Sequence, residues 1–492
     1  MKGLFSTTVL ASLTASTVTA QVQNDSYKHL NVLYIMADDL NSDMGSFDDP
    51  LVQTPNLDRL RANALRFTGA YCQFPLSGPS RASIMTGYYP EKTRVYDLQT
   101  DFRENIPAAV TLPELFKING YYTARVGKIY HAGVPFDIGG PGLDDAQSWQ
   151  TTYNPIGIDK TEEHKVHILT PDLVGPKRRI GGSLAYLVTD GPDDLHTDAI
   201  GANIAASLIR QHKDEPFFIA TGFYRPHTPY VAPRKYFDLY PMEKIQLPYV
   251  PKNDWDDKPA AACNTKVRNY NLPSDSLRKA KQAYYAAISF MDAQIGKLLD
   301  VLEETGLADK TIIVFQSDHG YHMGDHNLWQ KQTLFEHCAN TPLIISVPGL
   351  TKGRQSTGEI VEFVDIYPTI AEVCQLENVP TNLSGRSFLP LLQNTASQSG
   401  KTAYTMLKRL KYPEGWTLEK RLAPVSGITG RSIRTSRYRY TEWDEGKLGG
   451  ELYDYQNDPN EFKNLYNNPV YKSLQDSLRS ILYEKYRHGE CS

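Results

Sequence analysis

The chain has few cysteines, no excess of charge of either sign and no long hydrophobic run. Its 492 residues include five cysteines, too few and too widely spaced for a disulfide framework or a zinc-binding pattern. With 52 basic and 56 acidic side chains and no long Lys/Arg run, it lacks the charge pattern typical of nucleic-acid binding. No apolar stretch of the mature chain is long enough to span a bilayer. These absences exclude disulfide-rich, nucleic-acid-binding and membrane-spanning proteins.

The N-terminus has the features of an export signal. Lys2 is followed by a mildly apolar stretch over residues 4–18, and Val18-Thr19-Ala20 resembles a small-residue cleavage site. We therefore expect residues 1–20 to be a signal peptide and the mature protein to be exported. The alternative is a disordered leader on a cytosolic protein.

Apolar runs alternate with amphipathic segments over most of the chain. Hydrophobic residues make up 40% of the sequence and charged residues 22%, which is enough to bury a core. The alternation predicts an α/β fold with a mostly parallel, doubly wound sheet. The expected strands are residues 31–36, 121–126, 217–221 and 311–315, and the expected helices begin at Thr54 and Thr111 and cover residues 274–304. The long, irregular stretches 132–192 and 226–273 are typical of functional loops.

The pattern changes after about residue 395. We predict a catalytic domain over residues 25–395 and a smaller C-terminal α+β domain over residues 396–492. The elements expected in the second are a strand at 432–443, a turn at 446–450, a partner strand at 451–455 and a helix at 471–486.

Acidic side chains and a histidine come directly after two of the predicted strands. Asp38 and Asp39 follow the first strand, and Asp318 and His319 follow the strand at 311–315. Because the carboxyl ends of parallel strands meet at one edge of a sheet, we expect these four side chains to converge. Three carboxylates and one imidazole suit Ca²⁺, or Mg²⁺, better than Zn²⁺. Taken alone, each pair also fits an ordinary turn or cap.

The segment Ser77-Gly78-Pro79-Ser80-Arg81 predicts an anion site. Pro79 suits the first turn of a helix, which puts Ser77 at the helix N-terminus, where free N–H groups and the helix dipole favour an anion. Arg81 lies four residues on and therefore on the same helix face, where its guanidinium can hold that anion. The alternative for this segment alone is a serine cap on an ordinary helix.

This segment, followed by Thr86-Gly87, resembles the signature of the sulfatase family, in which Cys or Ser is followed by Pro and Arg. The resemblance extends over nearly the whole mature chain and is strongest to the iduronate-2-sulfatase branch. It implies an alkaline-phosphatase-like fold, a large mixed and mostly parallel sheet sandwiched by helices, with a smaller C-terminal domain carrying an antiparallel sheet. Further matches, in family order, are Asn31-Val32, Asp38-Asp39, Gly127-Lys128 with His131, Pro226-His227, Ser317-Asp318-His319-Gly320, Lys331, Gly385-Arg386-Ser387, Leu452-Tyr453-Asp454 and Asp458-Pro459.

The resemblance also implies a mechanism. In sulfatases the signature Cys or Ser is oxidised to formylglycine, whose hydrate attacks sulfur with one hydroxyl and expels sulfate with the other; Ser77 matches that residue. The implied substrate is a sulfated carbohydrate, attacked from its end. The implied cation ligands are Asp38, Asp39, Asp318, His319 and the modified Ser77. Arg81, Lys128 and Lys331 match the residues that bind the nucleophile and the sulfate in the family. His131 matches the base, and His227 matches the acid.

The charges in this set agree with that chemistry independently of the resemblance. A sulfate ester is negatively charged, and more charge gathers on its oxygens in the transition state, so an arginine, two lysines and a divalent cation stabilise it. A histidine with a pKa near neutrality suits proton delivery to a sugar leaving group. The alternatives are that His131 and His227 are loop residues and that Lys331 is a surface lysine.

The chain departs from the animal members at one position, where Ser77 replaces Cys. Serine requires the radical maturase known from bacteria, which implies a bacterial source and export to the periplasm or beyond. Two alternatives follow: a phosphatase or phosphodiesterase that uses unmodified Ser77, and an inactive carbohydrate-binding pseudoenzyme.

Several other side chains are candidates for the substrate pocket. Tyr230, Trp255 and Trp329 have rings that stack on sugars, and simple packing is the alternative for each of them. Three more histidines lie close in sequence to the predicted cation ligands, and we interpret them as pocket or core residues rather than as metal ligands. They are His322, His326 and His337.

Overall fold

The computed structural model describes residues 29–42, 50–174, 180–411 and 426–491. The predicted signal peptide, residues 1–20, lies outside these ranges. Within them, no helix is both long enough and apolar enough to cross a membrane. Cys72, Cys263, Cys338 and Cys374 are free thiols.

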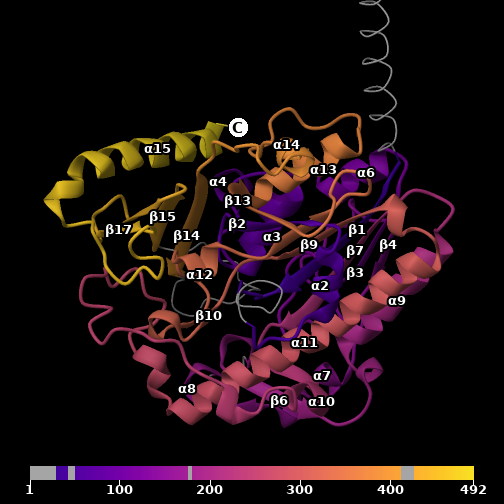
Figure 1. Cartoon of the computed structure of the whole chain (residues 1–492), viewed down its shortest axis with the longest axis horizontal. Helices are drawn as coiled ribbons and strands as arrows, with labels where there is room; N and C mark the ends of the chain where they lie inside the picture. Colours follow the sequence, from indigo (N-terminus) through magenta and orange to yellow (C-terminus); the bar gives the residue numbers. More distant parts are fainter. Residues whose placement is uncertain (1–28, 43–49, 175–179, 412–425, 492) are drawn as a thin grey trace, which may run out of the picture.

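An eight-stranded sheet forms the centre of the molecule (Figure 1). Its strands are parallel to their neighbours except β12, which is antiparallel to both β2 and β9. In the order in which they lie side by side, the strands are β13 (Gln355–Glu362), β2 (Leu65–Tyr71), β12 (Leu343–Ser346), β9 (Thr311–Ser317), β1 (Asn31–Asp38), β7 (Phe217–Pro226), β3 (Tyr122–Gly127) and β4 (Thr151–Tyr153).

The predicted mixed, mostly parallel sheet is therefore confirmed. The four strands expected from the sequence are β1, β3, β7 and β9, and they are direct neighbours in the order β9-β1-β7-β3. Each runs further toward its carboxyl end than the apolar run predicted, and β7 runs as far as Pro226. The extensions carry polar residues, which a search for apolar runs does not count as strand.

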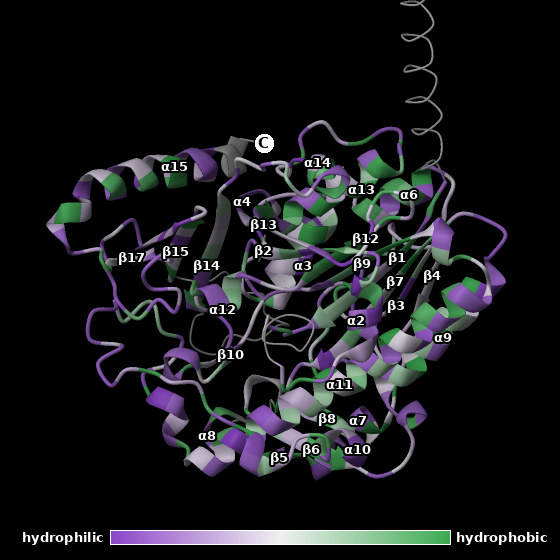
Figure 2. Cartoon of the chain, viewed as in Figure 1, coloured by the Kyte–Doolittle hydropathy of each residue, from purple (hydrophilic) through white to green (hydrophobic). Residues whose placement is uncertain are grey.

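Helices cover both faces of the sheet, and hydrophobic residues of sheet and helices meet between the layers (Figure 2). The predicted helix at 274–304 is present with the expected bounds, as is the capping box of Thr111 and Glu114. One face carries α2 (Pro55–Arg61), α9 (Thr197–Gln211) and α11 (Ser274–Glu304), and the other carries α3 (Ser77–Thr86), α6 (Leu112–Ile118), α13 (Ile366–Val373) and α14 (Leu389–Gln393).

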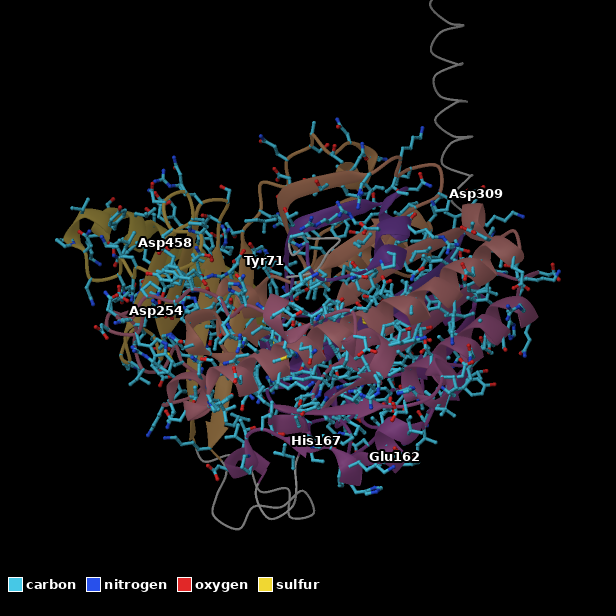
Figure 3. All side chains as sticks on the ribbon, turned by 60° about the horizontal axis from the view of Figure 1, so that its bottom comes forward. Tyr71, Glu162, His167, Asp254, Asp309 and Asp458 are labelled. Atoms are coloured by element: carbon cyan, nitrogen blue, oxygen red, sulfur yellow. The ribbon has the colours of Figure 1, made fainter. Side chains whose placement is uncertain are left out.

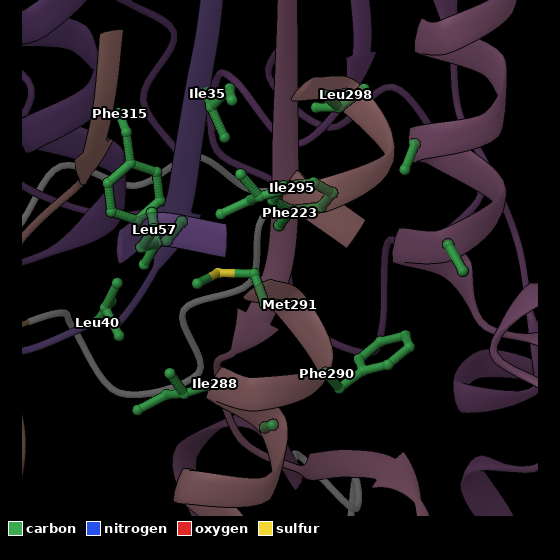
Figure 4. Packing of buried hydrophobic residues seen from close by; sticks show 14 of the residues in the cluster. Ile35, Leu40, Leu57, Phe223, Ile288, Phe290, Met291, Ile295, Leu298 and Phe315 are labelled. Carbon is green, nitrogen blue, oxygen red and sulfur yellow. The ribbon is translucent and has the colours of Figure 1, made fainter. Parts of the chain in front are cut away.

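The alternation of side chains along β1 divides the core into two layers. Ile35 packs with Met291 and Ile295 of α11 on one face of the sheet (Figure 4). Val32 and Tyr34 belong to the cluster on the other face. Because successive strand residues point to opposite faces, a strand buried on both sides must be apolar at nearly every position.

The C-terminal part forms a separate antiparallel sheet. Its strands lie in the order β14 (Ala403–Lys411), β15 (Ser426–Arg434), β16 (Tyr438–Trp443) and β17 (Gly450–Asp454), with α15 (Lys472–Cys491) beside them. The single strand predicted at 432–443 is wrong: this segment holds the end of β15, a tight turn and β16. The Thr435 N–H donates to the Tyr438 carbonyl oxygen at 2.8 Å, and the Tyr438 N–H donates to Thr435 Oγ1 at 2.8 Å, which closes the turn. The alternating sequence pattern continues across it. The domain division at residues 395/396 stays a prediction.

A buried polar cluster joins the two parts of the chain. Glu336 accepts hydrogen bonds from Tyr71 Oη at 2.8 Å and from Tyr455 Oη at 3.0 Å, and it pairs with Arg434 and Arg439 of the C-terminal sheet. Tyr71 lies where the two parts meet (Figure 3).

Short helices and strands lie in the long stretches predicted as loops and in other connections between the strands of the large sheet. The remaining helices and strands are α4 (Pro90–Thr93), α5 (Phe102–Asn105), α7 (Ile158–Thr161), β5 (His167–Ile168), α8 (Pro171–Val174), β6 (Ala185–Thr189), β8 (Tyr230–Pro233), α10 (Arg234–Phe237), β10 (His322–Met323), β11 (Trp329–Gln330) and α12 (Glu336–Ala339).

Two glycines allow β3 and β7 to approach closely at their carboxyl ends. Gly127 pairs with Gly222, and the backbone N–H of Lys128 donates to the Gly222 carbonyl at 2.8 Å. A Cβ atom on Gly222 would lie 1.8 Å from the carbonyl oxygen of Lys128. The position of Lys128 therefore depends on the absence of a side chain at Gly222.

We predict that Gly222→Ala lowers the free energy of unfolding by about 3 kcal/mol, because the methyl group must displace the backbone of Lys128. Denaturant unfolding measures this change. Gly182→Ala is the control, since a Cβ there meets nothing within 4 Å, and it is expected to change stability by no more than about 0.5 kcal/mol. Equal stability of the two variants would contradict the prediction.

Candidate active site

The carboxyl ends of four neighbouring strands carry six of the predicted site residues. All of these strands are parallel, so their ends meet at one edge of the sheet, as the sequence predicts for ligand-binding residues. The residues are Asp38 and Asp39 at the end of β1, Lys128 after β3, His227 after β7, and Asp318 and His319 after β9.

Three of these side chains form a group that fits a cation. The ligand atoms of Asp39, Asp318 and His319 all lie within 4.8 Å of one another. His319 Nε2 is 3.4 Å from Asp39 Oδ1 and 3.6 Å from Asp318 Oδ2. Its other nitrogen, Nδ1, lies 2.9 Å from the Gly320 carbonyl and donates to it, which leaves the lone pair of Nε2 directed into the group. Asp39 Oδ2 is buried and accepts no hydrogen bond within the described residues.

Electrostatics also favours a positive ion at this place. Burial raises the pKa of Asp39 to about 7; Lys331 opposes this shift, and the charges of Asp38 and Asp318 add to it. Burial lowers the pKa of His319 to about 4, so its ring is neutral and able to bind a metal. A donor set of carboxylate oxygens with one imidazole fits a hard divalent cation.

Ser77 points into the same group. As predicted, a helix begins here: α3 starts at Ser77. The Ser77 Oγ lies 3.1 Å from His319 Nε2 and 3.3 Å from Asp38 Oδ1, and the residue is 1% exposed. The next residue is held tightly, since a Cβ on Gly78 would lie 2.4 Å from the Asp97 carbonyl oxygen.

Arg81 contacts the carboxylates rather than an open anion site. Its Nε donates to Asp318 Oδ2 at 2.9 Å, and its Nη2 donates to Asp38 Oδ1 at 3.1 Å. The remaining donors reach the backbone carbonyl oxygens of Ala37, Lys128 and Ile129, at 3.4, 2.6 and 3.0 Å. All five N–H groups are thereby used and fix two carboxylates in place, while a role of Arg81 in holding the nucleophile and the sulfate stays a prediction.

The two predicted lysines border the group. Lys128 Nζ lies 2.5 Å from Asp38 Oδ2, and Lys331 Nζ pairs with Asp39 Oδ1. Burial lowers the pKa of Lys128. Burial also acts to lower the pKa of Lys331, but the charges of the carboxylates beside it have the larger effect and raise this pKa. Lys331 is thus part of the site and not a surface lysine.

Both predicted histidines lie at the site and are neutral there. His227 Nε2 is 3.5 Å from Asp39 Oδ2, and its Nδ1 donates to the Thr228 carbonyl at 2.5 Å. His131 Nδ1 is buried and has no hydrogen-bond partner among the described residues. Burial and then the charge of nearby lysines hold the pKa of both rings well below the usual range. The expectation of a pKa near neutrality is therefore wrong for the chain alone.

A buried ion pair that the sequence did not reveal supports the His227 loop. Arg225 Nη1 donates to the carbonyl oxygens of His227 and Pro229 at 2.8 and 2.6 Å, and Nη2 pairs with Asp159 Oδ2 at 2.7 Å. Asp198 accepts the backbone N–H of Arg225 at 3.0 Å. Arg225 stands next to the Pro-His motif, but no sequence signal links it to Asp159, which lies 66 residues earlier in an irregular stretch.

Two of the three aromatic residues considered for stacking on sugars are packed in the core. Tyr230 bonds to the Tyr321 hydroxyl at 3.0 Å, and Trp329 is 1% exposed and donates to Asn269. Trp255 is only partly buried. The packing alternative therefore holds for Tyr230 and Trp329.

Comparisons with known proteins agree with this geometry. The sulfatase family profile matches residues 30–376, and the profile of the C-terminal region of N-sulphoglucosamine sulphohydrolase matches residues 324–488. A sulfatase of Formosa agariphila is 32% identical over 94% of this chain and 88% of its own length. Human iduronate 2-sulfatase is 31% identical over 93% of this chain and 95% of its own.

A similar solved structure is that of the phosphonate monoester hydrolase of Silicibacter pomeroyi, with a TM-score of 0.76 and 23% identity, covering 93% of this chain and 96% of that one. This likeness concerns the fold. The profile match spans most of the chain, and the curated relatives match it over nearly its full length. The protein belongs to the sulfatase family and is a sulfatase.

Proposed function

We propose that the enzyme removes sulfate from a sulfated carbohydrate through a formylglycine made from Ser77, with an iduronate-2-sulfatase-like site that acts on the chain end. The observation that carries the proposal is the buried Ser77 Oγ, which lies between Asp38 and His319, in a group whose carboxylates pair with two lysines. The identity to human iduronate 2-sulfatase over 93% of the chain supports the same substrate class.

The proposed cation is Ca²⁺, with Mg²⁺ as the alternative. Its ligands would be Asp38, Asp39, Asp318, His319 and the modified Ser77. When bound, the cation offsets the charge of the carboxylates and acts as a Lewis acid toward the sulfate oxygens. Arg81 holds two of these carboxylates in fixed orientations.

Maturation would remove two hydrogens from the Ser77 side chain, which a bacterial radical maturase accepts as electrons and protons. The resulting aldehyde adds water and then supplies the attacking oxygen. Sulfur gains a bond to that oxygen and loses its bond to the sugar oxygen, which needs a proton. His227 Nε2 faces the site and would deliver that proton once the negative substrate raises the pKa of the ring.

Three further groups have proposed roles in the same reaction. Lys128 and Lys331 each have three N–H donors and direct one to a carboxylate, which leaves donors for the sulfate oxygens. Within the described part of the chain His131 Nδ1 has no hydrogen-bond partner, and it would accept a proton when sulfate leaves. We further propose that residues 1–20 direct export to the periplasm or the medium of a bacterial cell.

A second candidate function is phosphatase or phosphodiesterase activity of unmodified Ser77, since the similar structure from Silicibacter pomeroyi is described as a phosphonate monoester hydrolase. A third is a pseudoenzyme that binds carbohydrate without turnover. The experiment below separates all three.

We predict that co-expression with a radical maturase yields a Ser77 peptide lighter by two hydrogens and an enzyme that releases sulfate from 2-sulfated uronate-terminated saccharides. Mass spectrometry and ion chromatography measure the two outcomes. Ser77→Ala is the control and should be inactive, because it cannot form the aldehyde. Intact serine in a protein that hydrolyses phosphodiesters supports the second candidate, and a modified protein without sulfate release from a broad panel supports the pseudoenzyme.

We predict that Asp159→Asn reduces kcat on sugar sulfates about 100-fold, because the loop that holds His227 moves out of position. The loss should be much smaller for aryl sulfates, whose phenol leaves without protonation. Steady-state kinetics on both substrates measures the difference.

Asp190→Asn is the matched control for this variant, since it also breaks an Asp–Arg pair, but an exposed one with Arg234. It should leave kcat unchanged on both substrates. An equal loss on sugar and aryl sulfates in Asp159→Asn would contradict a role through His227.

A further inference from the structure

A second group of metal-binding side chains lies outside the active site. Among the described residues, the ligand atoms of His322, Asp325 and His337 all lie within 4.8 Å of one another, as they do in the group of Asp39, Asp318 and His319. His322 belongs to β10, Asp325 opens a short 3-10 helix (Asp325–Asn327), and His337 belongs to α12. The sequence predicted the two histidines to be pocket or core residues.

The distances in this group suit a shared ion better than direct hydrogen bonds. His337 Nε2 is 3.3 Å from Asp325 Oδ1, and His322 Nδ1 is 3.8 Å from Asp325 Oδ2. Good hydrogen bonds between such atoms are shorter, about 2.7–3.2 Å. Two ligands at about 2.1 Å from a tetrahedral zinc ion lie about 3.4 Å apart. The active-site group shows similar separations, 3.4 and 3.6 Å.

A second partner holds the ring of His322 in place. His322 Nε2 lies 2.8 Å from Thr333 Oγ1, and the residue is fully buried. Nδ1 faces Asp325 and has no hydrogen-bond partner among the described residues; in the tautomer whose Nε2–H donates to Thr333, its lone pair is free to bind an ion. A second hydrogen bond that fixes ring orientation in this way is typical of metal-binding histidines.

The donor set differs from that of the active site and selects another metal. Two imidazoles and one carboxylate are typical of zinc with one open position, whereas three carboxylates favour calcium. The side chains of His337 and Asp325 are 25% and 13% exposed, so an ion and a water ligand can reach the group. His326 is not a member, because its Nδ1 bonds to Asp254 Oδ2 at 3.0 Å.

We propose that His322, Asp325 and His337 form a second, zinc-binding site. The ion ties β10 to α12. β10 pairs with β11, where His322 lies opposite Gln330, and Lys331 follows directly. Backbone bonds already join the same segments, since Tyr321 N–H donates to the His337 carbonyl at 2.7 Å. The zinc ion therefore fixes the hairpin that leads into the active-site lysine, and this holds whatever ester the enzyme cleaves.

The test is the metal content of the purified full-length enzyme, measured by inductively coupled plasma mass spectrometry after growth with added zinc. We expect one zinc ion per chain, and Asp325→Asn and His337→Gln are expected to weaken zinc binding at least about 100-fold. Zinc-edge anomalous diffraction should put the ion between the three side chains. With calcium present in excess, addition of zinc to chelator-treated wild-type enzyme should raise its Tm further, and Asp325→Asn should lack this rise.

Two controls separate this site from others. Asp39→Asn removes a ligand of the active-site group and should keep its zinc. His167→Gln changes an exposed histidine at the edge of the molecule (Figure 3) and should keep it too. Folded wild-type enzyme without zinc would overturn the proposal and leave the group as a salt bridge. Zinc that persists in Asp325→Asn and His337→Gln, or that is lost from Asp39→Asn or His167→Gln, would overturn it equally.

Discussion

Three buried carboxylates crowded at one edge of a sheet are the constraint on which the rest of this structure depends. Asp38, Asp39 and Asp318 are each at most 1% exposed, and burial of several like charges is unfavourable unless cationic groups compensate them. Compensation comes from a guanidinium whose donors are all engaged and from two ammonium groups. These three positive charges equal the three negative ones, so what points to a divalent ion is the donor geometry of Asp39, Asp318 and His319 rather than an excess of charge.

The sheet makes this crowding possible because its central strands are parallel. Parallel neighbours end at the same edge of the sheet. Single residues at the ends of β1, β3, β7 and β9 therefore come within a few ångströms of one another, although they lie far apart in the sequence. The close approach of Gly127 and Gly222 brings Lys128 toward the same point. The arrangement of the site residues therefore depends on the order of the strands in the sheet more than on any single segment of the sequence.

Much of this was accessible from the sequence. Apolar runs identified the central strands, and the residues directly after them include the proposed cation ligands and Lys128, because both features are local in the chain. Features that depend on contacts between distant segments were not accessible. The Arg225–Asp159 pair, the burial of Tyr230 and Trp329, and the full use of Arg81 donors arise only when loops far apart in sequence pack together.

The burial of Ser77 bears on the order in which the chain would be modified, folded and exported. The side chain lies beneath segments that follow it by 50 to more than 200 residues, among them the turn after β9 that brings His319 to 3.1 Å. The proposed maturase would need access to this serine, which is 1% exposed in the finished fold. Under the proposed function, modification of Ser77 would have to precede folding, and for an exported chain it would have to be complete before the polypeptide leaves the compartment that contains the maturase.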